Sequence, residues 1–322
     1  MSTIPGADWD RAVAAIERAD AVCLACHVHP DGDALGSMLA FALALRGLGK
    51  QVVASFGEPF TVPAMLGFLP GQELLSEPGC YPAEPKVMIT FDAASRDRLG
   101  SLAPYAEKAR ELIVIDHHVS NPGFGSINLV DTYAAATAVV AERLLALLGA
   151  ALTREVADGL YTGLASDTGS FKYPTTTPEV HTLAGKLVAA GVRPEGIGRE
   201  LWDRSSFGLL KVLAGALERA VLDRAAGLVW TTVSEADRHA QGVAYDQLEG
   251  VIDVLRKVDE AEVAVVCKQN DEGEWYVSTR SKGAVDVGRL CAALGGGGHR
   301  LAAAFTVHDR PADAIERLRD LL

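Results

Sequence analysis

The sequence predicts an α/β protein of two domains, in which a mainly parallel sheet flanked by helices is followed by a smaller α/β unit. Its length of 322 residues exceeds the usual size of one hydrophobic core. Up to about residue 190, short apolar runs alternate with helical patterns, as in parallel sheets with crossover helices. From about residue 206 this pattern changes, which indicates a second domain.

Runs that are apolar on both faces predict the strands of the first domain, because helices cover a parallel sheet on both sides. These runs are Val22–Ala25, Gln51–Ser55, Lys86–Phe91 and Glu111–Ile115. Stretches of helix-forming residues predict helices at Ala34–Leu48, Arg98–Arg110, Ala134–Leu148, Thr153–Leu164 and Glu179–Ala190. The first domain is therefore placed at residues 1–190.

Residues 191–206, with Pro194 and several glycines near their start, predict a linker, and residues 207–322 predict the second domain. Expected there are a helix, three strands and two helices, at Phe207–Leu222, Gly227–Val233, Glu262–Lys268, Trp275–Thr279, Val285–Leu294 and Ala312–Leu322. The polar segment 269–274 predicts a hairpin turn. The glycine run Gly295–Gly298 indicates a tight backbone conformation.

Composition and charge limit the possible functional classes. Hydrophobic residues make up 49% and charged residues 22% of the chain, which suits packed cores and leaves little room for long disordered tails. The net charge of −12 disfavours tight binding of long duplex nucleic acid, whereas a small anionic substrate stays compatible. The longest apolar stretches are too short or too interrupted to cross a bilayer. We expect a cytoplasmic protein with no export signal and no membrane partner.

Five cysteines, mostly in apolar runs, indicate reduced core residues rather than a disulfide framework. Residues 23–27 match the C-x-x-C-H pattern of haem attachment. Haem attachment is disfavoured because the motif continues an apolar strand and no export signal is expected. A metal-binding His27 at the end of that strand agrees better with the pattern.

Histidines and aspartates follow three of the predicted strands at the point where each strand ends. They are His27, Asp92 and the triplet Asp116-His117-His118. The carboxyl ends of parallel strands meet at one edge of a sheet, where open α/β sheets bind their ligands. Adjacent histidines behind an aspartate at a buried strand end are costly to keep unless they bind something. We therefore expect these side chains to form one site.

Three further aspartates add to this set. A proline and a glycine break the chain after the first strand, so that Asp31 and Asp33 can point to the same place as His27. Taken alone, either aspartate also fits a helix cap, as does Asp92. Asp167 ends a predicted helix, where a cation would offset the unfavourable helix dipole, although an exposed turn also accommodates it. Carboxylates with imidazoles suit Mn²⁺ or Mg²⁺, with zinc as an alternative.

A second group of candidate residues lies in the second domain. The glycine run allows several backbone N–H groups to converge on an oxyanion, and His299 and Arg300 add positive charge, although a flexible hinge is the alternative. The segment 279–282 is a further compact cationic patch at a strand end. The remaining histidines show no partner pattern and are expected to be ordinary surface or core residues: His29, His181, His239 and His308.

With these motifs in this order, the chain resembles the DHH/DHHA1 phosphoesterases, and most closely the group of bifunctional oligoribonucleases and PAP phosphatases, the nano-RNases. The resemblance runs from His27 to His299 and covers nearly the whole chain. It implies an N-terminal DHH domain and a C-terminal DHHA1 domain with the active-site cleft between them. One departure is Ala304, where many relatives carry glycine after two alanines.

The resemblance also implies roles for individual residues. One metal ion would be held by His27, Asp31 and Asp92, and a second by Asp33, Asp92, His117 and Asp167. His118 would face the phosphate, while Asp116 orients the histidines and Arg98 supports the site. The nucleotide portion would be bound by Arg280, Ser281, Lys282, Gly296, Gly297, Gly298, His299 and Arg300.

The leading hypothesis is a hydrolase with two divalent ions, expected to be Mn²⁺, that degrades short RNA oligonucleotides to mononucleotides and 3′-phosphoadenosine 5′-phosphate to AMP. Cyclic dinucleotides or their linear products are further candidate substrates. Two ions about 3.5 to 4 Å apart would lower the pKa of a bridging water and stabilise charge on the phosphoryl oxygens. The alternatives are an inorganic pyrophosphatase-like hydrolase, a single-strand DNA exonuclease and a non-catalytic nucleotide sensor. The sequence does not rank the substrates, and polarity of degradation, physiological metal and subunit number stay open, with a homodimer as one arrangement.

Overall fold

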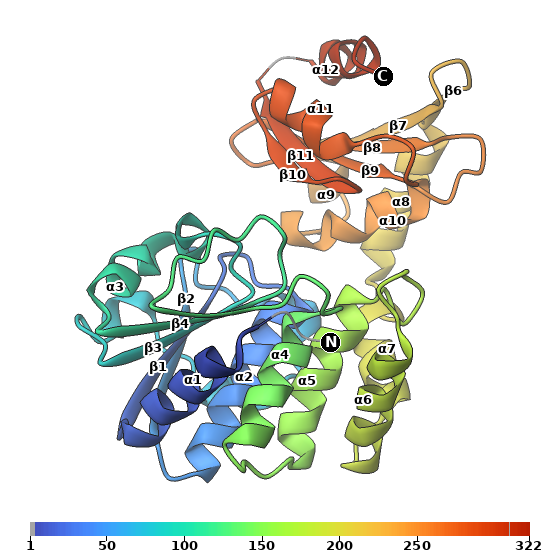
Figure 1. Ribbon diagram of the computed structural model, residues 1–322. Helices are drawn as coiled ribbons and strands as arrows, with labels where there is room; N and C mark the ends of the chain where they lie inside the picture. Colours follow the sequence, from blue (N-terminus) through green and yellow to red (C-terminus); the bar gives the residue numbers. More distant parts are fainter. Residues whose placement is uncertain (1–3, 309) are drawn as a thin grey trace. The chain divides into compact units, whose positions relative to one another are not determined.

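The computed structural model describes residues 4–308 and 310–322 and divides into two compact units, Met1–Arg204 and Ser205–Leu322. Each unit has its own sheet and its own buried cores (Figure 1). The α/β class predicted from the sequence is confirmed. Within the described ranges, the structure contains no helix that combines the length and the apolar character needed to cross a membrane.

The first unit is built on five parallel strands in the order β2-β1-β3-β4-β5. Their bounds are Ala21–Cys26 (β1), Gln51–Phe56 (β2), Val87–Phe91 (β3), Glu111–Asp116 (β4) and Ile127–Val130 (β5). The apolar residues of β3 are buried along its whole length, because helices cover both faces of the sheet. The strand order reverses between β1 and β3, which is the kind of position where open α/β sheets bind ligands.

Helices cover the two faces of this sheet unequally (Figure 1). The larger core lies against α1 (Gly6–Arg18), α2 (Gly32–Gly47), α4 (Thr137–Leu147), α5 (Arg154–Asp167) and α6 (Pro178–Ala189). A smaller core on the other face includes residues of η4 (Arg96–Leu102) and α3 (Ala103–Lys108). Three further 3₁₀ turns, η1 (Ala64–Leu66), η2 (Gln72–Leu74) and η3 (Pro78–Cys80), lie between β2 and β3.

Helices α2 and α5 approach each other closely because glycines face each other across their contact. A Cβ atom added at Gly36 would lie 2.5 Å from the Gly159 carbonyl oxygen, and one added at Gly159 would lie 2.6 Å from the Gly36 carbonyl oxygen. A Cβ atom at Gly163 would lie 2.6 Å from Asp33 Oδ1. The glycines therefore let the end of α5, which carries Asp167, come beside the start of α2.

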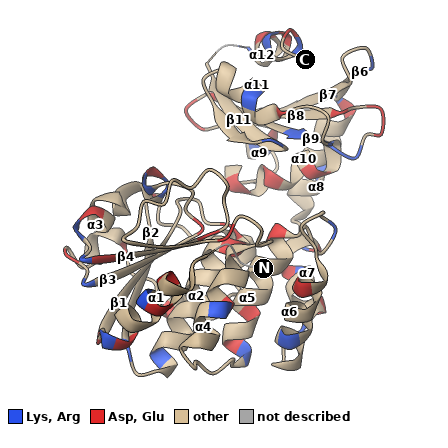
Figure 2. Ribbon diagram, in the orientation of Figure 1, with Lys and Arg blue, Asp and Glu red and all other residues tan. Residues whose placement is uncertain are grey.

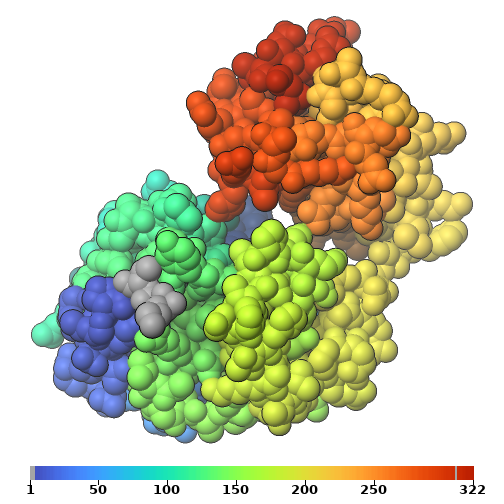
Figure 3. Space-filling view, turned by 45° about the vertical axis from the view of Figure 1, so that its right-hand side comes forward, coloured from blue at the N-terminus to red at the C-terminus, as the bar shows by residue number. Residues whose placement is uncertain are grey.

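Three predictions for the first unit need correction. The edge strand β5 was not expected, because it is short and only every second residue is buried. The helix predicted at Arg98–Arg110 is broken, since Gly100 has a φ of 56° and interrupts η4 internally, while α3 begins only at Ala103. The predicted linker contains α7 (Pro194–Trp202), whose Ile197 and Leu201 are buried in the first core. In the space-filling view the yellow-green α6 and α7 segment packs on the first unit (Figure 3).

The second unit contains a six-stranded sheet in the order β10-β11-β9-β8-β7-β6, in which β7 and β8 are parallel and the other neighbours antiparallel. The strands are β6 (Val221–Asp223), β7 (Leu228–Val233), β8 (Val263–Gln269), β9 (Trp275–Ser281), β10 (Gly297–His299) and β11 (Ala302–Val307). The helices are α8 (Phe207–Glu218), α9 (Glu235–His239), α10 (Val251–Leu255), α11 (Val287–Ala293) and α12 (Pro311–Arg319), with a 3₁₀ turn η5 (Tyr245–Gly250). The polar segment 269–274 joins β8 to β9 as a hairpin, as predicted.

The glycine run of the second unit forms part of an edge strand, which was not predicted. Gly297 pairs with Ala304 in antiparallel register, and Gly298 pairs with Ala303. A Cβ atom added at Gly296 would lie 2.1 Å from the Ala304 carbonyl oxygen, and one at Gly298 would lie 2.5 Å from Ala303 Cα. Strand signals were weak here because glycine and alanine have low β propensity. The glycines are needed for the close approach of the two strands.

Candidate metal centre

The polar residues that follow the strands of the first sheet lie together at its carboxyl edge. The pairing of β1 with β3 and of β3 with β4 continues to the last residues of β1 and β3. His27, Asp92 and Asp116 therefore lie at one level on three neighbouring strands. Figure 2 shows acidic segments, in red, at this edge of the sheet. These loops and helices supply three groups of potential metal ligands, and within each group the ligand atoms all lie within 4.8 Å of one another.

His27 presents one ring nitrogen to two carboxylates. Its Nε2 lies 3.5 Å from Asp92 Oδ2 and 3.8 Å from Asp31 Oδ2. Its Nδ1 lies 2.9 Å from the Val28 carbonyl oxygen, to which the neutral ring donates when that nitrogen carries the proton. This contact fixes the ring and leaves Nε2 as the metal-binding atom. The Arg98 guanidinium lies 3.3 Å from Nδ1, at the nitrogen that faces away from the carboxylates.

Asp31 is placed both to cap a helix and to bind a metal ion, the two functions that the sequence left open. Its Oδ1 accepts hydrogen bonds from the backbone N–H groups of Asp33 and Ala34, at 3.0 Å each, and so caps α2. Its Oδ2 faces His27. One carboxylate therefore caps the helix with one oxygen and offers the other to a cation.

Asp33 is completely buried and accepts three hydrogen bonds. The donors are the Thr137 N–H at 2.5 Å, the Ala138 N–H at 2.9 Å and the Ser37 hydroxyl at 3.0 Å. Burial, together with the nearby carboxylates of Asp92 and Asp167, nevertheless raises the pKa of Asp33 well above its usual value. The N-terminus of α4 thus holds a carboxylate that a cation would strongly stabilise.

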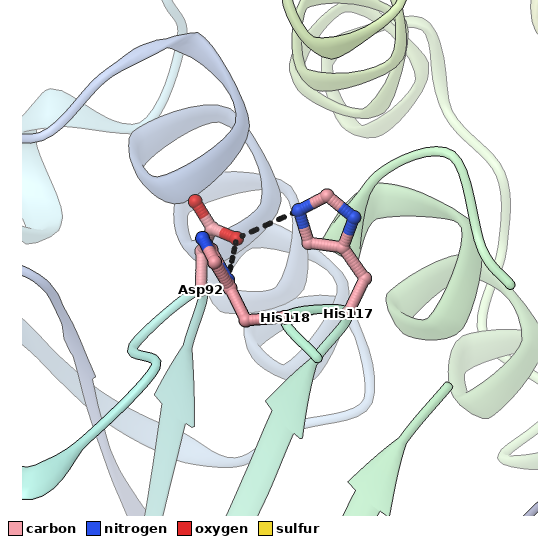
Figure 4. Close-up of side chains that lie close together, drawn as sticks. All are labelled: Asp92, His117 and His118. Carbon is pink, nitrogen blue, oxygen red and sulfur yellow. Dashed lines mark ion pairs between the residues drawn. The ribbon is translucent and has the colours of Figure 1, made fainter. Parts of the chain in front are cut away.

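Asp92 lies at the centre of the site. Its backbone has a φ of 56°, in the left-handed region that non-glycine residues rarely adopt. Its Oδ1 accepts a hydrogen bond from the Thr137 hydroxyl at 2.8 Å and lies 3.5 Å from both His117 Nε2 and His118 Nδ1 (Figure 4). Because its other oxygen faces His27, Asp92 belongs to two ligand groups and is placed to bridge them.

Asp116 orients the two histidines that follow it. It is completely buried, and its Oδ1 accepts hydrogen bonds from the His117 N–H at 2.8 Å and from His118 Nδ1 at 2.7 Å. The Asn121 side-chain amide donates to Asp116 Oδ2 at 2.6 Å and to the Ala93 carbonyl oxygen at 3.2 Å. Burial would raise the pKa of Asp116, but these donors outweigh it and lower the pKa.

Asp167 is the last residue of α5 and completes a third group with Asp33 and His117. His117 Nε2 lies 3.1 Å from Asp167 Oδ2, while His117 Nδ1 lies 3.2 Å from the Ala134 carbonyl oxygen. As with His27, a backbone carbonyl fixes one nitrogen and the other faces the carboxylates. The helix end thus carries a carboxylate that faces the other ligands.

The electrostatics of this edge favour a cation. Burial raises the pKa of Asp167 to about 6, and neighbouring carboxylates add to the shift. Burial disfavours the charged forms of His27 and His117, but the surrounding aspartates outweigh it and raise both pKa values to about 10. Too many carboxylates share too small a volume, so protons are retained where a metal ion would otherwise bind. Carboxylate and imidazole donors fit Mn²⁺ or Mg²⁺.

Sequence reasoning missed the residues that support the ligands. Ser37, Thr137 and Asn121 each hydrogen-bond a carboxylate of the site, yet none lies in a motif that indicates this role. The only available signal was position, because Asn121 follows the histidine pair by three residues and Thr137 begins a helix.

The predicted nucleotide-binding residues of the second unit are only partly brought together. Arg280 on β9 and His299 on β10 both pair with Ala302 of β11, so they lie in one row across three neighbouring strands. Alternation of side chains along a strand places residues of one such row on the same face of the sheet. Arg280 and His299 therefore share a face that can receive an anion.

Three other predicted residues make contacts within the second unit. The Ser281 hydroxyl donates to Glu262 at 2.9 Å, and the Lys282 ammonium donates to the Val258 carbonyl oxygen at 2.5 Å. The Arg300 guanidinium donates to the Gly283 carbonyl oxygen at 3.1 Å. Their side chains thus stabilise the turn after β9.

The four histidines without a partner pattern lie outside this centre. His181 stacks on Phe171, and His308 Nδ1 lies 3.4 Å from Glu274. His29 has a left-handed φ of 53° in the turn before α2. His239, Glu235 and Asp271 could together surround an ion, but the buried Arg238 already pairs with Asp271.

Comparisons with known families agree with this organisation. The profile of the DHH family, N-terminal domain, matches residues 21–164, and the profile of the DHHA1 domain matches residues 229–322. The first match contains His27, Asp31, Asp33, Asp92 and His117, and Asp167 follows it by three residues. The second match contains Arg280 and His299.

Individual relatives resemble the chain over almost its whole length. The bifunctional oligoribonuclease and PAP phosphatase NrnA of Thermus thermophilus is 34% identical over 92% of this chain and 87% of that protein. The protein of the same name from Bacillus subtilis is 26% identical over 90% of each chain. The crystal structure of an exopolyphosphatase-related protein from Bacteroides fragilis superposes with a TM-score of 0.92 at 23% identity, over 99% of this chain and 96% of that one. This structural likeness establishes a shared fold.

Proposed function

This chain belongs to the DHH family and carries a DHHA1 domain, and we propose that it hydrolyses short oligoribonucleotides to mononucleotides and 3′-phosphoadenosine 5′-phosphate to AMP. Membership makes it a metal-dependent phosphoesterase. The proposed substrates follow those for which the relatives from Thermus thermophilus and Bacillus subtilis are named. The observation that carries the proposal is the convergence on one sheet edge of six potential ligands that are spread over residues 27–167.

We infer two ion positions from the three ligand groups. His27, Asp31 and Asp92 would hold one ion, and the second would be held by Asp33, Asp92, His117 and Asp167. Bound there, two Mn²⁺ ions would supply an activated water and neutralise charge on the phosphoryl oxygens. Thr137 and the backbone N–H groups of α4 hold Asp92 and Asp33 in place for this purpose.

His118 is assigned the contact with the phosphate. Burial disfavours its imidazolium form, but Asp116 and Asp92 outweigh this effect and raise the pKa of His118. The His118 ring donates its Nδ1 proton to Asp116 Oδ1 at 2.7 Å. Its other nitrogen, Nε2, is then the atom that donates to a phosphoryl oxygen. Asn121 fixes Asp116 from the other side, so the ring orientation is set before substrate binds.

Arg280 and His299 are assigned the nucleotide portion of the substrate. An arginine and a histidine side chain in one row of the sheet suit a phosphate group of the substrate. Ser281, Lys282 and Arg300 are assigned a supporting role, because their side chains hold the adjoining turn. A few cations suffice for a substrate with few phosphates, which agrees with the net charge of −12.

The proposal is tested with purified protein and added Mn²⁺. We expect release of mononucleotide from a diribonucleotide and of phosphate from 3′-phosphoadenosine 5′-phosphate, with a cyclic dinucleotide and inorganic pyrophosphate assayed in parallel. Asp92→Asn should reduce turnover to the rate without enzyme, whereas Asp203→Asn, at an exposed position, should not. Binding without turnover in the unmodified protein would indicate a nucleotide sensor. Faster hydrolysis of pyrophosphate than of either nucleotide would replace the proposal with a pyrophosphatase.

A further inference from the structure

The segment directly after Asp167 has an unusual backbone. Gly169, Ser170 and Phe171 have φ values of 57°, 60° and 63°, so that three consecutive residues lie in the left-handed region. Glycine adopts this conformation readily, but for other residues it is sterically unfavourable. Such strain persists only where the surroundings determine the backbone, and it is frequent next to functional groups.

Hydrogen bonds tie this segment to the turn of α5 that carries Asp167. The buried Thr168 hydroxyl donates to the Leu164 carbonyl oxygen at 2.6 Å and accepts from the Phe171 N–H at 3.0 Å. The Ser170 N–H donates to the Ala165 carbonyl oxygen at 2.7 Å. Any change in the path of residues 169–171 is therefore transmitted directly to the end of α5.

Aromatic contacts hold the segment from its other side. The Phe171 ring centroid lies 5.8 Å from that of Tyr161 on α5 and 5.6 Å from the ring of His181, with which it stacks at an interplanar angle of 23°. His181 lies in the first turn of α6, so the stack connects α5 to α6. The Tyr173 ring covers Gly169, where an added Cβ atom would lie 2.4 Å from it.

We propose that Phe171 and His181 are positioning residues for Asp167. Their stack clamps the left-handed segment between α5 and α6, and this clamp fixes the carboxylate that faces His117 at 3.1 Å. The inference rests on the proposed function, because Asp167 matters as a ligand only if the second ion binds. It assigns a function to a histidine that the sequence left without one.

The position of the clamp predicts which property changes when it is removed. The ligand group His27, Asp31 and Asp92 contains no residue of the segment 168–173, so the first ion should bind as before. The second ion needs Asp167 in place, and loss of groups that orient a ligand typically weakens metal binding about 10- to 100-fold. A selective loss of one ion is therefore the expected signature.

The experiment measures Mn²⁺ binding to full-length Phe171→Ala and His181→Ala by calorimetric titration and by electron paramagnetic resonance. We expect the second ion to bind at least about 10-fold more weakly, with the first unchanged. His181→Phe keeps a ring that can stack on Phe171 and should restore binding. Tyr105→Ala is the matched control, since it removes an aromatic contact with Tyr81 elsewhere in the same unit.

Two outcomes would overturn the inference. One is unchanged binding of both ions in the two alanine variants, and the other is failure of His181→Phe to restore what His181→Ala loses. Asp167→Asn separates this failure from failure of the proposed function. If Asp167→Asn weakens the second ion while the clamp variants do not, only the clamp is wrong. If Asp167→Asn leaves both ions unaffected, the proposed ligand set itself is wrong.

Discussion

Buried carboxylates are tolerable in this site because each one has specific donors. Asp33 accepts from two backbone N–H groups at the start of α4, where the helix dipole also favours negative charge. Asp116 accepts from four donors, and the more exposed Asp31 accepts from two N–H groups in the first turn of α2. These donors fix the carboxylates but do not neutralise them. Asp31 and Asp33 are therefore positioned for a cation before one binds, and Asp116 holds His117 and His118 in place beside them.

Thr137 offers the sharpest test of this preparation. Its hydroxyl donates to Asp92 at 2.8 Å, while its backbone N–H donates to Asp33. Thr137→Val keeps the shape and the backbone contact but removes the hydroxyl, so Asp92 loses a donor. We expect kcat/KM for a diribonucleotide to fall about 10- to 100-fold. Thr182→Val, which removes a hydroxyl bonded to the Pro178 carbonyl oxygen on α6, should have no such effect.

Glu262 makes a pH-dependent contribution to the second unit. Burial would raise the pKa of Glu262, but the Ser281 hydroxyl and the backbone N–H groups of residues 283–285 outweigh it and lower the pKa below 4.5. Because the folded pKa is the lower one, this stabilisation is present above pH 4.5 and is lost as the pH falls through the folded value.

Glu262→Gln should therefore lower the free energy of unfolding at pH 7 by at most about 1 kcal/mol, since the charge-assisted hydrogen bonds that are lost are partly screened by solvent. The difference from the unmodified protein should shrink as the pH is lowered toward 3. Urea denaturation at several pH values measures it, with the exposed Glu316→Gln as control. An equal difference at both ends of the pH range would contradict this account.

At the level of elements, the glycine contact between α2 and α5 determines the geometry of the centre. Gly159→Ala places a Cβ atom against the Gly36 carbonyl oxygen, which is backbone and cannot rotate away. The helices must then separate, and Asp167 moves relative to Asp33. We expect a loss of stability of about 1 to 3 kcal/mol from overpacking. We also expect kcat to fall about 100-fold, because a displacement of catalytic groups by about 1 Å typically has an effect of this size.

Gly185→Ala on α6 is the matched control, because a Cβ atom at Gly185 meets nothing within 4 Å. A helix interior prefers alanine to glycine, so this variant should gain about 0.5 to 1 kcal/mol of stability and keep its activity. Thermal melts and initial rates distinguish the two variants. Similar behaviour of both would mean that the α2 and α5 contact does not control the site.

The sequence predicts those elements whose signals are local. Continuous apolar runs located four of the five strands of the first sheet, and the polar residues after them located the ligands. Strands β5, β6, β10 and β11 were missed, because β5 and β6 are short, β10 is rich in glycine and β11 begins with three alanines. The helix predicted at Phe207–Leu222 ends at Glu218, and the last two residues of that range belong to β6. Thr137 was missed because its partners Asp92 and Asp33 are 45 and 104 residues away in the sequence. The residues next to Thr137 in the sequence give no sign of such long-range contacts.

At the scale of the whole molecule, the acidic groups that could bind a cation lie together in one of the two units. The net charge is −12, and the carboxylates of the centre lie within one unit, between residues 31 and 167. In the absence of a cation, histidines retain protons and Asp33 and Asp167 resist ionisation. Metal binding removes this repulsion, so it should stabilise the unit that holds the ligands.

Removal of the metal should therefore affect the two units differently. With Mn²⁺ at about 100 times its dissociation constant, the first unit should gain about 2.7 kcal/mol, which slows exchange through cooperative opening about 100-fold. Hydrogen exchange followed by mass spectrometry, with Mn²⁺ or with EDTA, should show new protection in peptides of β3, β4 and the facing ends of α2 and α5. Peptides of β8 and β9 should be unchanged, because their core lies in the other unit. Equal gains in both units, or equal gains in Asp92→Asn, would contradict a metal centre confined to the first.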